Sequence, residues 1–284
     1  MSREEVSTSL TEQVERLTAE SKARATAVSV HDLESGLRFS LRGDRWFHAA
    51  STIKVAVLVA LFRAVDEGRV RLDDSLHVRN RFFSAANGSP FQLNRDSDAM
   101  PELYQTIGQT AKVSALAEGM ISASSNLATN LLLDFVGVAY ARNVLRDAQV
   151  EGVELRRGVE DHAAHEKGIN NEATADGLMT LLSALRGNFL SSESKEQAIR
   201  ILLEQRFNSM IPAGLPAHAA VAHKTGEIST ACHDMGIVYL PEREPYIAVI
   251  LTEFDSEKEG RRETVAAISE AIYHSVMRMK GEIK

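Results

Sequence analysis

The first 41 residues carry two successive hydrophobic patterns. Apolar residues recur every three to four positions over 6–23, which is the spacing of a helix with one buried face. Over 25–41 the pattern changes to alternation, and Glu34-Ser35-Gly36 supplies a turn between two short alternating runs. This part of the sequence predicts an amphipathic helix followed by a β-hairpin.

The middle of the chain is dominated by helical spacing from residue 51 onward. Apolar runs with that spacing predict helices over 51–67, 113–122, 126–136, 138–148, 173–186 and 194–205. The segment 80–111 holds Gly88, Pro90, Pro101 and Gly108, so we expect an irregular excursion on the surface there.

Strand patterns return near the end of the chain. Short β-rich runs over 219–224, 234–240 and 246–252 are separated by turn signals, and 265–279 has the spacing of a closing amphipathic helix. The simplest architecture is an α+β fold in which the early hairpin pairs with the late strands in one antiparallel sheet, flanked by the terminal helices. We expect residues 1–50 with 206–284 to form this lobe and 51–205 to form a helical lobe.

Composition excludes several classes of protein. The 284 residues are 44% hydrophobic and 25% charged, with a formal net charge of −7, which fits an ordinary globular protein and gives no basic stripe for nucleic acid. Cys232 is the single cysteine, so no disulfide forms within the chain. The polar stretch 1–19 has no apolar signal core, and the longest apolar run, 55–62, is too short to cross a bilayer. We therefore expect a cytoplasmic protein, or a periplasmic or secreted one if an upstream signal has been removed.

Ser51 and Lys54 form the first candidate for chemistry. They stand at the start of a run, Val55 to Phe62, that is apolar on every face and therefore predicts a buried helix. A buried lysine tends to lose its proton, and a serine three residues earlier on the same face would be activated by it. The alternative is a helix cap with a lysine that reaches solvent, because Ser-x-x-Lys is common and recurs at Ser192 to Lys195 in a polar segment.

Two further tripeptides carry suitable groups. Ser124-Ser125-Asn126 directly precedes an apolar helical run, so on its own it is most simply a helix cap. Lys224-Thr225-Gly226 follows an alternating run and lies at a strand end. A cation, a hydroxyl and a glycine that permits close approach suit a substrate with a carboxylate, and the alternative is a plain turn.

These three motifs, in this order and on these elements, resemble the signatures shared by class A β-lactamases and penicillin-binding proteins. The resemblance extends to the hairpin around Gly36, to Phe47 before the first motif and to the last strands from His233 to Leu251. It implies the β-lactamase-like fold, with an active site between the two lobes.

The resemblance also implies roles for individual residues. Ser51 would attack the acyl carbonyl, Lys54 would help to deprotonate it, and Ser124 would relay a proton to the leaving nitrogen. The substrate would be held by the side chains of Asn126, Lys224 and Thr225 beside Gly226. The backbone N–H groups of Ser51 and Glu227 would form the oxyanion hole.

The sequence departs from the family pattern at two motif positions. Ser125 stands where β-lactamases commonly carry Asp, and Glu227 stands where a small or hydroxyl residue is expected. Glu166, with Asn170 four residues later, fits the spacing of the family's water-activating glutamate. The same segment also fits a short surface helix ended by Gly168, which would leave Glu166 in solvent.

Three hypotheses follow for function. The first is hydrolysis of a β-lactam amide through an acyl-enzyme on Ser51. The second is an esterase or D-alanyl peptidase-like hydrolase, and the third is a non-catalytic sensor that uses the pocket only to bind a ligand. The nine histidines show no metal-ligand spacing with a carboxylate, so we expect no metal or cofactor. The expected partner is a small molecule with a carboxylate, with no nucleic acid and no membrane; the sequence does not indicate an oligomeric state.

Overall fold

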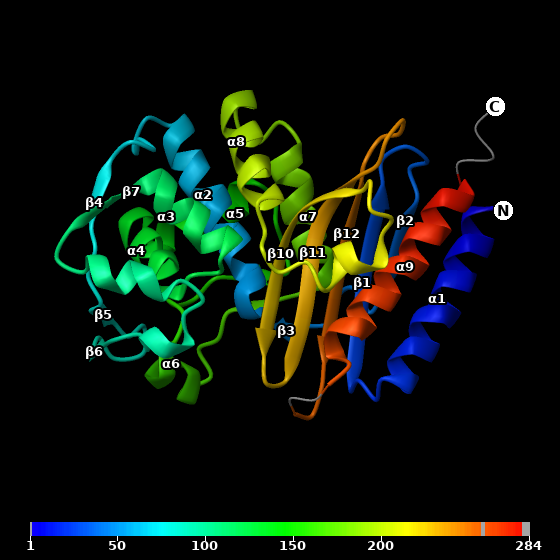
Figure 1. The fold of residues 1–284 in the computed structure, drawn as a ribbon, viewed down its shortest axis with the longest axis horizontal. Coiled ribbons are helices and arrows are strands. Elements are labelled where there is room, and N and C mark those ends of the chain that lie inside the picture. Colours follow the sequence, from blue (N-terminus) through cyan, green and yellow to red (C-terminus); the bar gives the residue numbers. More distant parts are fainter. Residues whose placement is uncertain (1, 257–258, 280–284) are drawn as a thin grey trace.

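A five-stranded antiparallel sheet forms the centre of the fold in the computed structural model, which describes residues 2–256 and 259–279 (Figure 1). Its strand order is β10-β11-β12-β1-β2, so the early hairpin pairs with the late strands as the sequence predicts. The strands are β1 (Ala25–Asp32), β2 (Arg38–Leu41), β10 (Ala220–Ile228), β11 (Ala231–Tyr239) and β12 (Tyr246–Glu253).

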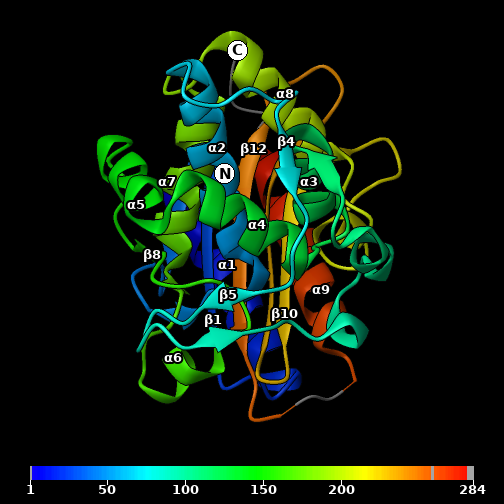
Figure 2. The same ribbon diagram turned by 90° about the vertical axis from the view of Figure 1, so that its left-hand side faces the viewer.

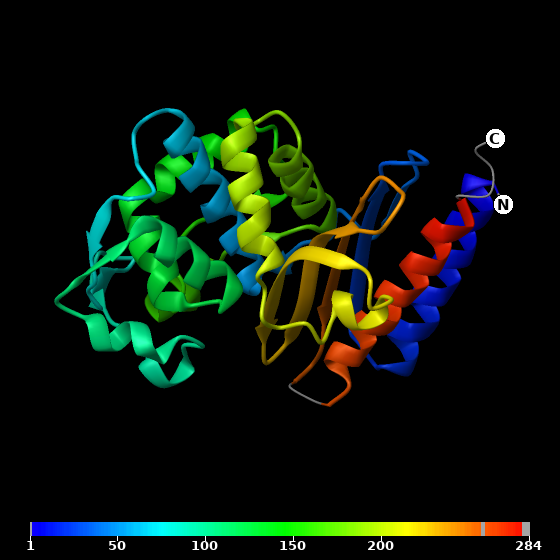
Figure 3. The same ribbon diagram turned by 45° about the horizontal axis from the view of Figure 1, so that its top comes forward.

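Each face of the sheet is covered by helices because its strands alternate between two cores. On β12, Ile247, Val249 and Leu251 belong to the core shared with the helical lobe. The residues between them face the other core, which is closed by α1 (Arg3–Glu20) and α9 (Arg261–Met279). Figure 3 shows these two terminal helices side by side on the outer face of the sheet.

The helical lobe is built around α2 (Lys54–Asp66), whose side chains are buried from Lys54 through Phe62 (Figure 2). The all-round apolar run therefore forms the buried helix that the sequence predicts. Around it pack α3 (Val113–Ser122), α4 (Asn126–Val136), α5 (Val138–Asp147), α7 (Ala175–Arg186) and α8 (Ser192–Leu203). The second Ser-x-x-Lys sequence is the start of α8, where Ser191 caps the helix and Lys195 donates to the Gly187 carbonyl.

The connections within this lobe contain short elements that the sequence patterns do not predict. The three small sheets are formed by β3 (Phe47–His48), β9 (Glu172–Ala173) and β8 (Val153–Glu154), by β4 (Ser75–His77) and β7 (Thr110–Lys112), and by β5 (Phe82–Phe83) and β6 (Pro90–Phe91). Short helical segments complete the chain: η1 (Ala50–Ile53), η2 (Arg95–Ser97), η3 (Pro101–Thr106), α6 (His162–Glu166) and η4 (Ile211–Gly214).

The η1 turn that precedes α2 lies directly against the edge strand β10. A Cβ added to Gly226 would lie 3.0 Å from the Thr52 backbone nitrogen and 3.1 Å from that of Ser51. Glycine is therefore needed at this position because any side chain would push the two elements apart. Within the described residues, no helix is long and apolar enough to cross a membrane.

Candidate functional site

A turn of 3₁₀ helix, η1, presents Ser51 to the groove between the lobes. The sequence predicts a continuous helix from residue 51, but the α-helical part begins at Lys54, and Ala50 has a left-handed φ of 47°. Side chains at i and i+3 eclipse in a 3₁₀ turn, so Ser51 and Lys54 lie on one face. Positive φ is unusual for alanine and is typical of backbone strain held at functional sites.

Lys54 is completely buried and is held by three oxygen acceptors. Its Nζ donates to the Ser124 carbonyl at 2.7 Å, to Asn126 Oδ1 at 2.8 Å and to Ser124 Oγ at 3.1 Å. Burial disfavours the ammonium form and lowers the pKa of Lys54 to about 7, although Asp98 and Glu160 act in the opposite direction. Lys54 thus exists partly as a neutral amine near neutral pH and can accept a proton.

Ser124 lies between two buried lysines. Its Oγ accepts hydrogen bonds from Lys54 Nζ and, at 3.0 Å, from Lys224 Nζ. Burial and the nearby charge of Lys54 hold the pKa of Lys224 well below its ordinary value. Ser124 itself has a φ of 57°, a second strained non-glycine position, which turns its hydroxyl toward both amines.

Asp98, which the sequence analysis missed, fixes the turn between α3 and α4. It is buried, and its Oδ2 accepts from Asn126 N and Leu127 N, both at 2.9 Å, and from Ser125 Oγ at 3.2 Å. Ser125 also caps α4 by accepting from Ala128 N, as the capping interpretation expects. Asp98 comes from a loop 27 residues earlier than Ser125, so nothing in the local sequence marks it.

Glu160 is the second residue that the sequence analysis missed, and it reaches the centre of the site. Its Oε1 accepts from Asn126 Nδ2 at 2.6 Å, and Asn126 Oδ1 in turn accepts from Lys54. Glu160 has a left-handed φ of 58°. The carboxylate is thereby linked through one amide to the buried amine next to Ser51.

Glu166 lies elsewhere, so the expectation that it activates water does not fit this geometry. It is the exposed last residue of α6, which Asp161 caps and which ends before Gly168 with its φ of 71°. The alternative interpretation of this segment, a short surface helix, is the one that the structure has. The spacing between Glu166 and Asn170 does not locate the carboxylate in the site. The loop approaches Asn126 at Glu160, which lies six residues before Glu166 and precedes α6.

The end of β10 carries a cluster of charges toward α9. The Glu227 carboxylate accepts from Arg261 Nη2 at 3.0 Å and from Arg262 Nε and Nη2 at 3.0 and 2.8 Å. Glu227 stands where the family pattern has a small or hydroxyl residue, and its acidic side chain is paired with two arginines. Arg262 remains about half exposed, whereas Arg261 is buried.

Two cavities meet at Ser51. The first, of about 220 Å³, is lined by Ser124, Thr225 and the segment 207–210, and among the described residues its cationic side chain is Arg262. The second, of about 430 Å³, is lined by Glu160, His48, His165 and Arg157. A larger hollow of about 800 Å³ beside Trp46 and α5 contains none of the residues named so far in the site.

In residues 2–256 and 259–279, no group of three or more His, Cys, Asp or Glu side chains is placed to hold a metal ion. What the site brings together is a serine, two buried amines, a bridging hydroxyl and a carboxylate, which are the groups required for acyl transfer.

Comparison with known proteins assigns the family. Residues 9–276 match the model of the beta-lactamase enzyme family, so the chain belongs to this family and is a hydrolase of the serine β-lactamase class. It is 26% identical over 256 residues to beta-lactamase ROB-1 of Haemophilus influenzae, covering 88% of this chain and 79% of that one.

Solved structures share the whole fold. An acyl-enzyme complex of a PBP-A mutant with penicillin G superposes with a TM-score of 0.81 at 28% identity, covering 95% of this chain and 97% of that one. An ancestral class A beta-lactamase gives a TM-score of 0.80 at 27% identity, covering 94% and 99%. The β-lactamase-like fold expected from the sequence is therefore confirmed.

We expect one lysine to titrate near pH 7 in the folded protein. The measurement is a pH titration of the lysine side-chain signals by NMR with ¹³C at Cε, in the intact protein and in Lys54→Met. The signal with a midpoint near 7 should be absent from Lys54→Met and present in Lys195→Met, a control on α8. A Lys54 signal that titrates near the ordinary value of about 10.4 would contradict the burial argument.

Proposed function

We propose that this protein hydrolyses β-lactams through an acyl-enzyme on Ser51. The observation that carries the proposal is the Ser124 hydroxyl held between the buried amines of Lys54 and Lys224, beside a serine on the same face as Lys54. This arrangement provides a proton acceptor for the nucleophile and a proton path to the leaving group. Neither an esterase-like substrate nor a purely binding role has a specific observation in its favour.

Acylation follows from the positions of these groups. Neutral Lys54 takes the Ser51 hydroxyl proton while Oγ forms a bond to the lactam carbonyl carbon. The C–N bond then breaks, and the nitrogen receives a proton from Ser124, which is replenished from Lys54 at 3.1 Å. The backbone N–H groups of Ser51 and Glu227 are the proposed oxyanion donors, as the resemblance implies.

Deacylation is assigned to Glu160 in place of Glu166. Its carboxylate lines the same cavity as Ser51 and is bonded to Asn126. A water in that cavity gives a proton to Glu160 as its oxygen attacks the ester carbon. When the bond from this carbon to the Ser51 oxygen breaks, Glu160 returns the proton through bound water to the Ser51 oxygen, so the carboxylate, the Ser51 hydroxyl and neutral Lys54 are all restored.

Arg262 is assigned to the substrate carboxylate, with Thr225. The family resemblance implies this role for Lys224, but Lys224 is fully buried and donates to Ser124 and to the Thr225 carbonyl. Arg262 lines the cavity that contains Thr225, and Glu227 holds one edge of its guanidinium, leaving the other edge for a carboxylate. In this assignment Lys224 handles protons and Arg262 supplies the charge that binds the substrate.

The proposal is tested by intact-protein mass spectrometry during reaction with benzylpenicillin. We expect an adduct of one penicillin mass that is lost on Ser51→Ala, with little change in the thermal midpoint because Ser51 lies at the cavity wall. An adduct that persists in Ser51→Ala would overturn the assignment of the nucleophile. If intact protein forms neither adduct nor product, β-lactams are not its substrates, and esters and D-alanyl peptides become the next to test.

Replacing Glu160 separates the two halves of the reaction. Glu160→Gln keeps the shape but removes the base, so the acyl-enzyme should accumulate and steady-state turnover should fall by about 10²- to 10⁴-fold. The matched control is Glu166→Gln, which changes an exposed residue of α6 and should turn over normally. The same mass-spectrometric time course checks both variants, and accumulation in Glu166→Gln instead would reverse the assignment.

Removing the charge of Arg262 should weaken binding of anionic substrates. A hydrogen bond to a charged group contributes about 1.5–3 kcal/mol, so Arg262→Gln should raise KM by about 10- to 100-fold with a smaller effect on kcat. Steady-state kinetics with benzylpenicillin and with its methyl ester provide the check, since the ester lacks the carboxylate. Arg16→Gln on the exposed face of α1 is the control, and equal losses for acid and ester would contradict the assignment.

A further inference from the structure

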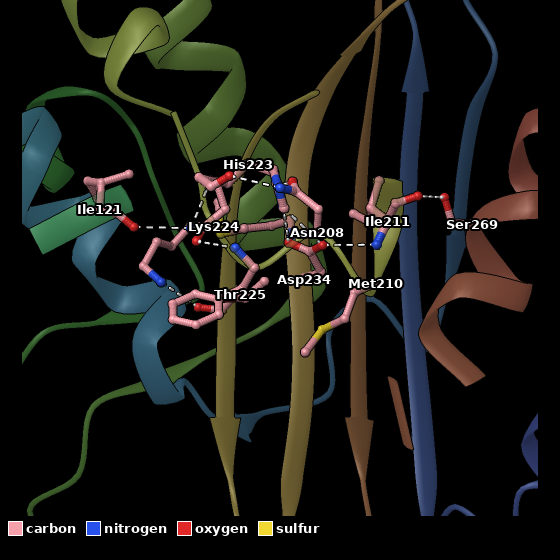
Figure 4. Close-up of polar contacts among 12 residues, drawn as sticks. Ile121, Asn208, Met210, Ile211, His223, Lys224, Thr225, Asp234 and Ser269 are labelled. Carbon is pink, nitrogen blue, oxygen red and sulfur yellow. Dashed lines mark hydrogen bonds and ion pairs between the residues drawn. The ribbon is translucent and has the colours of Figure 1, made fainter. Parts of the chain in front are cut away.

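A buried histidine–aspartate pair lies behind the binding strand and takes no part in the proton path described above. His223 precedes Lys224 on β10, is 1% exposed, and its Nδ1 lies 3.0 and 3.1 Å from the two oxygens of Asp234 on β11. Asp234 is fully buried and also accepts from the backbone N–H of Ile211 and Met235, both at 3.0 Å (Figure 4). These contacts join two strands of the sheet to the segment before η4.

The hydrogen-bond partners require a proton on both nitrogens of His223. Asn208 Nδ2 donates to the Gln205 carbonyl at 3.1 Å, which leaves Asn208 Oδ1 facing His223 Nε2 at 3.1 Å. An amide oxygen only accepts, so Nε2 must donate, and Nδ1 must donate to the Asp234 carboxylate. Only the imidazolium meets both partners, and either neutral tautomer would place two lone pairs against each other.

The pair holds one wall of the substrate cavity. Phe207, Ser209 and Met210 line the 220 Å³ cavity with Ser51 and Thr225, and they belong to the segment that is bonded to the pair at Asn208 and Ile211. Ile211 is also fastened from the outer side, where its carbonyl accepts from Ser269 of α9 at 2.9 Å. In Figure 4, Asn208 and Ile211 both lie close to Asp234, in front of the strands.

The charged groups that face the pair are few. Lys224 lies on the same strand as His223. Burial and the charge of Lys54 on α2 lower the pKa of Lys224, and the charge of Asp234 acts in the opposite direction. The groups that the 205–211 segment directs at the pair are the Asn208 amide and the Ile211 N–H, which carry no charge, and α9 reaches this region through the Ser269 hydroxyl. Asp234 is thus the counter-ion of a cationic His223.

We propose that cationic His223, with Asp234, is a positioning residue that holds the 207–210 wall against β10 and so sets the affinity for substrate. The proposal rests on the proposed function insofar as it concerns β-lactam binding. When the bond from His223 to Asn208 or to Asp234 is removed, the wall is released, and substrate binding weakens while the groups around Ser124 stay in place.

The protonation state is measured first, without any substrate. In protein labelled with ¹⁵N at histidine, we expect at neutral pH one buried ring with N–H couplings at both nitrogens. His223→Gln should remove this ring, and the exposed His218→Gln should leave it unchanged. Asn208→Ala, at an exposed position, should perturb only its Nε2 signal and serves if His223→Gln does not fold. A neutral His223 ring at pH 7 would overturn the proposal whether or not the protein hydrolyses β-lactams.

The effect on binding is measured as KM and kcat for benzylpenicillin at neutral pH. Asn208→Ala should have a KM raised about three- to tenfold and a kcat within about twofold of normal. A KM of Asn208→Ala that matches the intact enzyme would overturn the proposal. Loss of turnover with an intact doubly protonated ring would instead count against the proposed function alone.

Discussion

The burial of two lysine amines around one serine hydroxyl is the constraint on which the rest of the site depends. An isolated ammonium is costly to remove from water, so Lys54 and Lys224 are stable in place only because oxygen acceptors surround them. The same burial lowers the pKa of both amines, and the lowered pKa of Lys54 makes it a proton acceptor near neutral pH. Stability is given up here for reactivity, which is consistent with the strained φ values at Ala50 and Ser124.

The fold excludes water from the two lysine amines and holds them rigidly in place. Helix α2 is enclosed by the other helices of its lobe, and β10 is braced by β11 and, through the His223–Asp234 pair, by the segment before η4. Gly226 lets β10 approach the η1 turn before α2 so closely that an added Cβ would lie 3.0 Å from the Thr52 backbone nitrogen. Lys54 comes from the helical lobe and Lys224 from the sheet. Both amines donate to the Ser124 hydroxyl, which links the two halves of the molecule.

Much of the fold and of the site could be predicted from the sequence, because hydrophobic periodicity and short motifs are local features of the chain. Periodicity predicted α3 and α4 with their exact bounds, and the motif residues Ser51, Lys54, Ser124 and Lys224 lie together as the resemblance implies. The sequence patterns did not predict three residues of the site, because these residues approach it from loops or from a helix end far along the chain. They are Asp98, Glu160 and Arg262. Glu166 had the right spacing but the wrong position, since spacing alone does not show where a loop turns back.

The most direct test of the account is the pH dependence of acylation in a single turnover, measured by stopped flow with a chromogenic cephalosporin. In the proposed mechanism neutral Lys54 is the proton acceptor, so the acylation rate should be low in acid and rise as pH passes about 7, the pKa of Lys54 in the folded protein. In Glu160→Gln the rise should remain, since that residue acts after acylation. A rate that is independent of pH between 5 and 9, with the adduct still on Ser51, would contradict the claim that the buried lysine activates the serine.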